Sequence, residues 1–192
     1  MKPFPLSRFT EAFTSLNIRE IPDFSCWSFR DGMKFGNIDN WWEEEDNLRP
    51  GPHEGLDFAT FLDTSVQLQF LSPGAMVPPI FMGHVLNIID DFLGQTIIMG
   101  HEYKFDPDHS LRLLSFMAHL LPFPEVRPGS KIAAFDALGE IAPGNNKCRP
   151  HLHISTAWAS PSFSAADFLW ADFQENEGLL PCDPLQFIDM EG

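Results

Sequence analysis

The sequence predicts a mainly β fold, an antiparallel sandwich or barrel-like sheet with short helices near the two ends of the chain. Short apolar segments recur between residues 81 and 158, separated by Gly, Pro, Asp and Asn. No long helical pattern lies between these segments, which is typical of folds in which successive strands pair with one another. The chain has 192 residues, enough for one domain with a substantial core.

Residues 1–50 are predicted to form an N-terminal cap. Ser7 is a candidate N-cap for a short helix, because a serine side chain can satisfy the free backbone N–H groups at a helix start. Three apolar residues follow at helical spacing, Phe9, Phe13 and Leu16. We interpret this stripe as core packing rather than as a binding face.

The end of this cap, residues 39–50, reads DNWWEEEDNLRP and joins a pair of tryptophans to an acidic run. The usual interpretation is a solvated loop whose indoles pack inward. The alternative is a lip beside a substrate site. The sequence leaves both interpretations open.

The central segment, residues 51–160, is predicted to be the main β domain. Turn sequences such as SPGAM, RPGSK and APGNN bound its apolar segments. Strands are expected over residues 81–90, 94–101, 111–120, 137–142 and 151–158.

The pattern changes beyond Pro161, and residues 161–192 are predicted to be a C-terminal helical extension. Ser164 is the candidate N-cap of its helix. The apolar residues expected on its buried side are Phe168, Leu169 and Phe173.

Composition and charge exclude several classes of function. Acidic residues outnumber basic ones 27 to 12, giving a formal net charge of −15. This balance argues against a nucleic acid partner and against binding to an anionic membrane surface. The hydrophobic content of 44% excludes a disordered acidic tail. No window reaches the roughly 18 uninterrupted apolar residues that a membrane helix needs.

The cysteines and the N-terminus indicate where the protein works. Cys26, Cys148 and Cys182 are too few for a disulfide framework and form no CxxC pair. An odd count is typical of a reducing compartment. The opening MKPFPLSRFTEAFTSL lacks the apolar run of a signal peptide. We therefore expect a cytoplasmic protein, and the sequence does not indicate an oligomeric state.

The segment PHLHI, residues 150–154, is a first candidate for chemistry. Strand alternation places His151 and His153 on one face and Leu152 on the other. Two neighbouring imidazoles repel each other when both are protonated. The pair therefore suits a cation site, or one metal ligand beside one general base, although a chance pair is equally compatible with this motif alone.

The segment PHEGLDF, residues 52–58, is a second candidate. His53 and Asp57 offer a nitrogen and an oxygen ligand of the kinds that zinc accepts. Pro52 and Gly55 argue against a helix, so the segment is expected to be a loop or irregular strand. It is not an HExxH motif, because Asp57 stands where that motif has its second histidine. Alone, the pair could be a hydrogen-bonded surface pair. With the His pair it supplies three ligands and an open position, the arrangement of catalytic zinc.

Three segments in order, HEGLDF, FMAHL and PHLHI, resemble the signature segments of the lysostaphin-type (LytM-like) zinc metallopeptidases. That family carries HxGxDF-like, YAHL-like and PHLHF-like segments, and the resemblance covers about residues 50–158. It implies a β core of the duplicated hybrid motif type. It also implies a zinc-dependent endopeptidase that hydrolyses peptide bonds, typically of peptidoglycan.

The resemblance assigns roles position by position. It implies that Zn²⁺ is held by His53, Asp57 and His153. It implies that His151 takes a proton from the attacking water and that His119 assists by stabilising the developing oxyanion. A peptide substrate is the implied partner.

The remaining histidines are not assigned to the reaction. His101 falls where the family often has a histidine outside the active centre. His84 and His109 match no family position, and we interpret them as structural or exposed residues.

The sequence leaves three alternatives to a peptidase open. The first is a non-catalytic module that keeps the fold and binds a metal or a partner. The second is a carrier domain with Lys131 as its modified residue, because RPGSKIAAFDALGEI is similar to biotinyl and lipoyl segments. The third is Cys148 as a thiol nucleophile, against which an incidental buried cysteine is the simpler interpretation.

Overall fold

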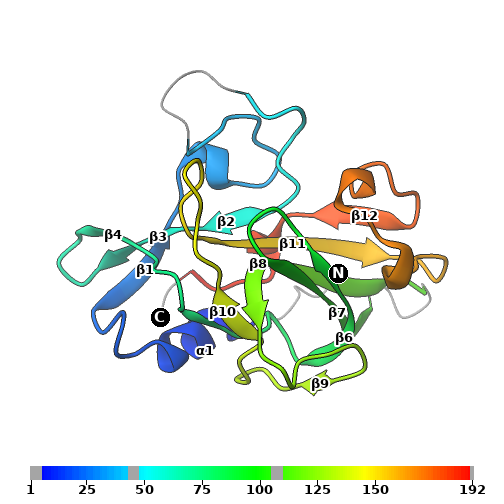
Figure 1. Ribbon diagram of the computed structural model, residues 1–192, viewed down its shortest axis with the longest axis horizontal. Helices are drawn as coiled ribbons and strands as arrows, with labels where there is room; N and C mark the ends of the chain where they lie inside the picture. Colours follow the sequence, from blue (N-terminus) through cyan, green and yellow to red (C-terminus); the bar gives the residue numbers. More distant parts are fainter. Residues whose placement is uncertain (1–5, 43–47, 105–109, 191–192) are drawn as a thin grey trace.

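The computed structural model describes residues 6–42, 48–104 and 110–190, and within them the protein is built mainly from antiparallel strands (Figure 1). The described strands form a nine-stranded sheet and a three-stranded sheet. The prediction of a mainly β antiparallel fold is confirmed. The main path of the large sheet runs β12-β11-β8-β7-β6-β9 and is open at both ends in these residues, so it is not a closed barrel.

The long strands of the large sheet lie where the apolar segments predict them. The five that match are β6 (Gly83–Asp90), β7 (Gln95–Lys104), β8 (Arg112–Pro122), β10 (Gly139–Ile141) and β11 (Leu152–Ala159). Four shorter strands complete the sheet, β2 (Leu56–Phe58), β5 (Met76–Val77), β9 (Lys131–Ile132) and β12 (Leu179–Cys182). β2 pairs with the start of β11, and this pairing builds the candidate site.

The small sheet has the order β1-β3-β4. Its strands are β1 (Phe24–Ser28), β3 (Thr60–Asp63) and β4 (Leu68–Phe70). It projects beside the large sheet, on the side where β2 passes into β3 (Figure 1). β1 belongs to the first 50 residues, so part of the predicted cap is strand paired with the following segment.

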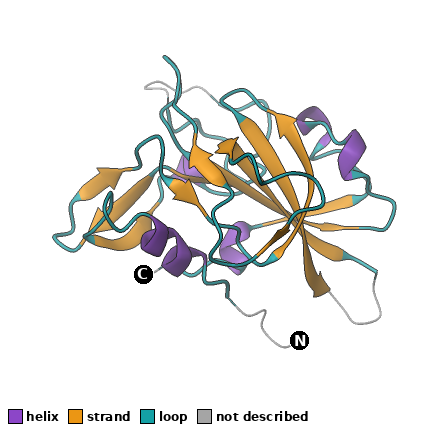
Figure 2. Cartoon of the chain, turned by 60° about the horizontal axis from the view of Figure 1, so that its bottom comes forward, coloured by secondary structure: helices purple, strands orange, loops and turns teal. Residues whose placement is uncertain are grey.

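The helix α1 (Phe9–Leu16) packs its aromatic side chains into the core. Figure 2 shows the helices of the chain lying beside the strands. Phe9 and Phe13 are buried, and the Phe9 ring lies 5.4 Å from that of Phe58. The interpretation of this stripe as core packing is confirmed. Ser7 as N-cap is wrong: the helix begins after Arg8, because Ser7 donates its backbone N–H to Phe187 and forms a bridge with Ile188.

Two apolar clusters cover the two faces of the central strands. Alternation along β8 sends Leu113 and Met117 into the larger cluster and Leu114 and Phe116 into the other. Because β8 is buried on both faces, it forms a fixed platform for His119 near its end.

The predicted C-terminal α-helix after Ser164 is wrong. The chain instead forms 3-10 turns η2 (Ala165–Asp167) and η3 (Trp170–Asp172), then β12 and a further turn η4 (Pro184–Gln186). Between η2 and η3 the backbone is extended at Phe168, which buries its ring 4.9 Å from that of Phe116, while Leu169 is exposed. Aromatic packing on the sheet therefore outweighs the local helical pattern.

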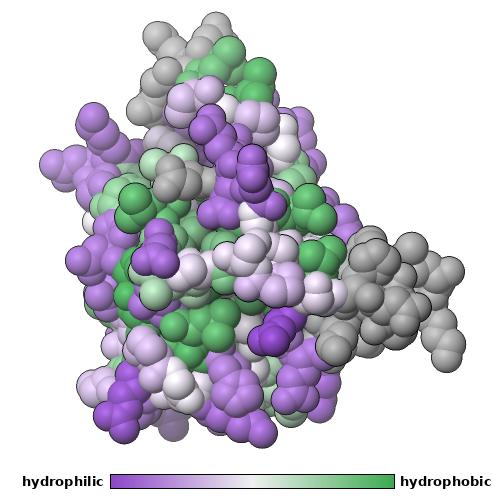
Figure 3. Space-filling model, turned by 90° about the vertical axis from the view of Figure 1, so that its right-hand side faces the viewer, coloured by the Kyte–Doolittle hydropathy of each residue, from purple (hydrophilic) through white to green (hydrophobic). Residues whose placement is uncertain are grey.

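One face of the surface is coloured by hydropathy in Figure 3. Hydrophilic residues cover much of this face, and hydrophobic residues form separate patches between them. No helix in the described part of the chain has the length and apolar character needed to cross a bilayer.

Candidate metal centre

The pairing of β2 with β11 brings the two histidine-containing motifs together. In this antiparallel ladder Asp57 lies directly opposite His153. His53 stands four residues before Asp57, just ahead of β2, and turns its ring to the same point. The register of one strand pair therefore joins side chains separated by 96 residues in the sequence.

Three potential ligand atoms converge at this point. His53 Nε2 lies 3.2 Å from His153 Nδ1 and 3.3 Å from Asp57 Oδ1. His153 Nδ1 lies 2.8 Å from the same carboxylate oxygen. Ligands about 2.0–2.1 Å from a tetrahedral zinc ion stand roughly 3.3–3.4 Å apart. The three side chains could therefore hold one metal ion.

The outer partners of the histidines leave their lone pairs facing one another. His53 Nδ1 lies 3.2 Å from the carbonyl oxygen of Lys34, so it carries the ring proton and leaves Nε2 unprotonated. His153 Nε2 is engaged by the hydroxyl of Ser155 at 2.8 Å. A proton on His153 Nδ1 would form a hydrogen bond to Asp57, but the lone pair of His53 Nε2 would still face the negative carboxylate. A cation bound between the three atoms removes this repulsion, so the three ligand atoms fit zinc.

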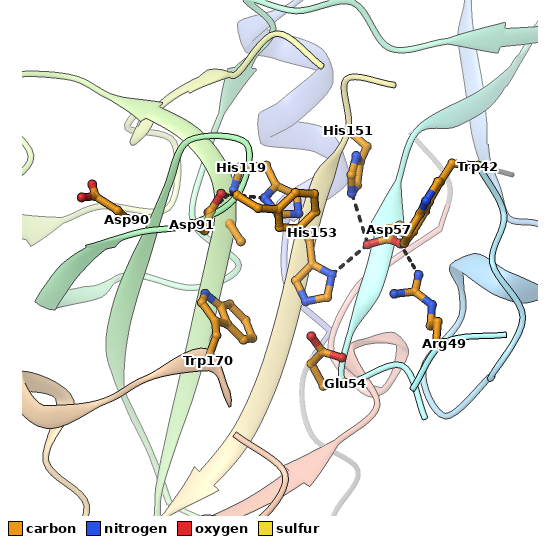
Figure 4. A pocket seen from close by; sticks show the side chains of 12 residues that line it. Trp42, Arg49, Glu54, Asp57, Asp90, Asp91, His119, His151, His153 and Trp170 are labelled. Carbon is orange, nitrogen blue, oxygen red and sulfur yellow. Dashed lines mark hydrogen bonds and ion pairs between the residues drawn. The ribbon is translucent and has the colours of Figure 1, made fainter. Parts of the chain in front are cut away.

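Asp57 is held from its other side. Its Oδ2 accepts hydrogen bonds from the indole of Trp41 at 2.7 Å and from Arg49 Nη2 at 3.0 Å, which leaves Oδ1 for the convergent point. Figure 4 shows the contact with Arg49. Burial would raise the pKa of Asp57, but His53, His151 and His153 together hold this pKa well below its usual value. The carboxylate is therefore ionised.

His151 lies beside the three potential ligands. Its Nδ1 donates to the carbonyl oxygen of Arg149 at 2.9 Å, so its Nε2 carries the lone pair and lies 3.7 Å from Asp57 Oδ1. Burial lowers the pKa of His151 to about 4, even though the neighbouring Asp57 raises it. The ring is therefore neutral near pH 7 and can accept a proton.

His119 approaches from the end of β8. Its ring centroid lies 4.7 Å from that of His151 and 5.8 Å from that of His153. Its Nδ1 lies 3.0 Å from a carboxylate oxygen of Asp91. The structure thus brings together all five residues that the sequence singled out, His53, Asp57, His119, His151 and His153.

Four of these side chains, all but that of His53, border a cavity of about 400 Å³ with aromatic walls. The walls are formed by Trp42, Phe92 and Trp170. Of the tryptophan pair, Trp41 is buried against Asp57 while Trp42 lines the cavity. Inward packing therefore holds for Trp41, and the lip interpretation stays a prediction for Trp42. The adjoining residues 43–47, which include the acidic run, lie outside the described residues.

The sequence reasoning missed Arg49 and Asp91, which contact the site from loops. Arg49 lies in a polar segment that contains no known motif. Only the neighbouring tryptophan pair indicated that this segment could lie beside a functional site. Asp91 belongs to the turn between β6 and β7, where an aspartate is ordinary.

The other two described histidines, His84 and His101, stand apart from this centre. His101 is buried, with Nδ1 3.1 Å from the carbonyl oxygen of Met82 and Nε2 2.9 Å from the Ser115 hydroxyl. Burial lowers the pKa of His101 to about 4. His84 is exposed, and His109 lies outside the described residues.

Two sequence alternatives find little support in the geometry. Burial, and then the charge of Asp57, raise the pKa of Cys148 to about 12, so its thiol stays protonated and is a poor nucleophile. Lys131 lies in β9, paired with β6 opposite His84, rather than at the tip of a tight hairpin.

Among known proteins, several solved structures are similar to this chain. No family model matches the sequence, and no curated protein does. The catalytic domain of the antimicrobial peptidase lysostaphin from Staphylococcus simulans is 18% identical, with 82% of this chain and 90% of that chain covered and a TM-score of 0.48.

Two further structures are similar at this level. A zinc-containing peptidase from Vibrio cholerae is 17% identical, with coverage of 71% and 37% and a TM-score of 0.44. A mutant catalytic domain of the prophage-encoded M23 protein EnpA from Enterococcus faecalis is 16% identical, with coverage of 72% and 91% and a TM-score of 0.42. The solved structures that this chain resembles are lysostaphin-type peptidases. At these identities the likeness is one of fold.

Proposed function

We propose that this protein is a zinc-dependent metalloendopeptidase that hydrolyses peptide bonds with an activated water molecule. One observation carries the proposal: three lone pairs, from His53, Asp57 and His153, meet within 2.8–3.3 Å of one another beside two further histidines. Structural zinc usually has four protein ligands, whereas catalytic zinc keeps one position open. Two of the three ligands, Asp57 and His153, line the cavity, which matches the catalytic arrangement.

The two groups of histidines have separate roles in this proposal. His53, Asp57 and His153 would hold zinc, which when bound polarises a carbonyl group and makes water more acidic. His151 is neutral and presents Nε2 to the same point, so it suits the general base. It accepts a proton as water adds to the carbonyl carbon, and returns that proton to the amine as the C–N bond breaks.

His119 suits the stabilisation of charge on the carbonyl oxygen. Its Nδ1 is engaged by Asp91, so the opposite edge of the ring is available to the cavity. A donor placed where negative charge develops contributes roughly 3–4 kcal/mol to catalysis in other enzymes.

A peptide of the peptidoglycan type is the proposed substrate. Aromatic walls suit an extended chain of small residues, because flat rings leave room for a backbone without bulky side chains. Glu54 and Asp90 also line the cavity, and their charges favour a substrate that carries amines.

The experiment combines metal analysis with an activity assay on the purified protein. His153→Ala and Asp57→Ala should lose stoichiometric zinc, because each removes one of three ligands. His151→Ala should retain zinc and lose cleavage of oligoglycine and of a stem-peptide library. His84→Ala, an exposed histidine, is the matched control and should retain both.

Two results would contradict the proposal. Full zinc occupancy in both ligand variants would exclude this metal site. Stoichiometric zinc without cleavage of any peptide in the library would favour a non-catalytic metal-binding module with the same fold.

A further inference from the structure

Asp91 makes more contacts than its place in a turn requires. It lies between β6 and β7, and its side chain is 3% exposed. Three of its hydrogen bonds are local: Oδ1 accepts from the backbone N–H groups of Leu93 and Gly94, and Oδ2 accepts from the Thr96 hydroxyl. Two more come from His119, which lies 28 residues away in the sequence.

His119 offers both its backbone and its side chain to this carboxylate. Its backbone N–H donates to Asp91 Oδ2 at 2.9 Å, and its ring Nδ1 donates to Oδ1 at 3.0 Å. The residue has a φ of +66°, in the left-handed region that side chains other than glycine seldom occupy. Such strain persists only where surrounding contacts fix it. The carboxylate of Asp91 supplies two of these contacts.

Asp63 shows what an aspartate does when it only shapes a turn. Its Oδ1 accepts from the backbone N–H groups of Ser65 and Gln67, and its Oδ2 accepts from the side chain of Gln69. It matches Asp91 in its turn contacts but lies on the surface at the β3–β4 turn. The two bonds to His119 are therefore additional to turn formation.

His151 and His119, the two histidines outside the proposed ligand set, have different hydrogen-bond partners, which indicates different roles. His151 Nδ1 faces a neutral carbonyl, that of Arg149, whereas His119 Nδ1 faces a carboxylate. Burial would raise the pKa of Asp91, but the bonds from His119 hold it below the ordinary range. To donate from Nε2 to a carbonyl oxygen while Nδ1 donates to Asp91, the ring must carry both protons, and an ionised partner stabilises that form.

We propose that Asp91 is a positioning residue that holds His119 through its Nδ1–H, so that the Nε2 edge of the ring faces the cavity beside His151. Asp91 lies on the side of His119 away from Asp57, so it acts on the reaction through His119 and not through the metal ligands (Figure 4). This inference rests on the proposed peptidase function, in which His119 contacts the carbonyl oxygen.

The test compares Asp91→Asn with its matched control Asp63→Asn in the zinc-loaded protein. Asp91→Asn should keep zinc and KM but lower kcat by about 10–100-fold, the range seen when a supporting partner is removed. Asp63→Asn should leave kcat unchanged. In a His119→Ala background, Asp91→Asn should cause no further loss, because residues that act through one another are not additive.

A second readout does not depend on activity. Nitrogen-15 NMR of the imidazole groups, with the His119 signals assigned from His119→Ala, should show a proton on Nδ1 in the native protein. In Asp91→Asn this preference should weaken. If Asp91→Asn does not fold, Asp91→Ser is the substitute, since serine can still form the turn but is too short to reach the ring.

Each outcome decides one of the two ideas. An unchanged His119 spectrum, or an equal loss of kcat from Asp91→Asn with and without His119, would overturn the role of Asp91. A native protein that binds zinc but cleaves no peptide would overturn the proposed function, and the NMR comparison would still decide whether Asp91 holds His119.

Discussion

The indole Nε1 of Trp41 donates a hydrogen bond to Asp57 Oδ2 at 2.7 Å, and this bond joins the N-terminal segment to the candidate metal centre. Arg49 reaches the same oxygen and also donates to the carbonyl oxygen of Gly32. Its guanidinium lies 4.6 Å from the centre of the Trp42 ring. Two donors on Oδ2 fix the rotation of the carboxylate and direct Oδ1 toward His53 and His153.

Trp41→Phe should weaken zinc binding by about 10–100-fold, because it removes a partner that orients a ligand. The phenylalanine ring keeps most of the apolar packing, so the effect on the metal can be separated from loss of the fold. Competition with a chelator of known affinity gives the dissociation constant.

Trp27→Phe is the matched control for that variant. Trp27 is also buried and donates one hydrogen bond, to Thr10 Oγ1 at 2.9 Å, away from the metal centre. Both variants should lose about 1–3 kcal/mol of stability through an unpaired acceptor or a lost bond. Equal zinc affinities in the two variants would argue against an orienting role for Trp41.

Gly55→Ala should disturb His153 directly. A Cβ at residue 55 would lie 2.7 Å from His153 Cε1 and closer still to the carbonyl oxygen of Ile154. Backbone contacts of this kind do not give way easily in a packed interior. We expect weaker zinc binding and a lower melting temperature, measured by chelator competition and by thermal unfolding.

Gly51→Ala provides the comparison in the same loop. Its added Cβ would meet only the side chain of Gln174 at 3.4 Å, an ordinary contact. Zinc affinity should be unchanged, and stability should change by no more than about 0.5 kcal/mol. If Gly55→Ala binds zinc as tightly as the native protein, the close approach of residue 55 to His153 is not needed to position this ligand.

The long strands carry a readable alternating pattern, and this pattern predicted that His151 and His153 share a face. The roles of His53, Asp57 and His119 came instead from ligand chemistry and from the resemblance of three segments to a known family. The strands β1 to β5 have two to five residues each, too few for periodicity to indicate them. Arg49 and Asp91 contact the site only through tertiary structure, so no local pattern marks them.

Phe173→Ala should test the packing that replaces the expected C-terminal helix. Its buried ring lies 5.0 Å from that of Phe116, so its loss should cost about 3–5 kcal/mol. Leu169→Ala is the control, because Leu169 is 63% exposed and should change stability by less than about 0.5 kcal/mol. Chemical denaturation measures both, and similar free energies of unfolding would contradict the observed arrangement.

His101 should make the protein less stable in mild acid. Burial lowers the pKa of His101 from 6.5 to about 4 in the folded protein. Between these two values the unfolded chain binds a proton that the folded chain does not, so stability falls as the pH drops from about 6.5 toward 4. A difference of this size corresponds to about 3 kcal/mol.

The change His101→Gln isolates this contribution, because glutamine fills similar space without titrating. Urea unfolding at pH 7 and pH 4.5 should show a smaller loss of stability in the variant than in the native protein. His84→Gln is the control, since an exposed histidine has nearly the same surroundings in the folded and unfolded chain. If His101→Gln and His84→Gln lose the same free energy on acidification, His101 is not the buried neutral group that its two hydrogen bonds indicate.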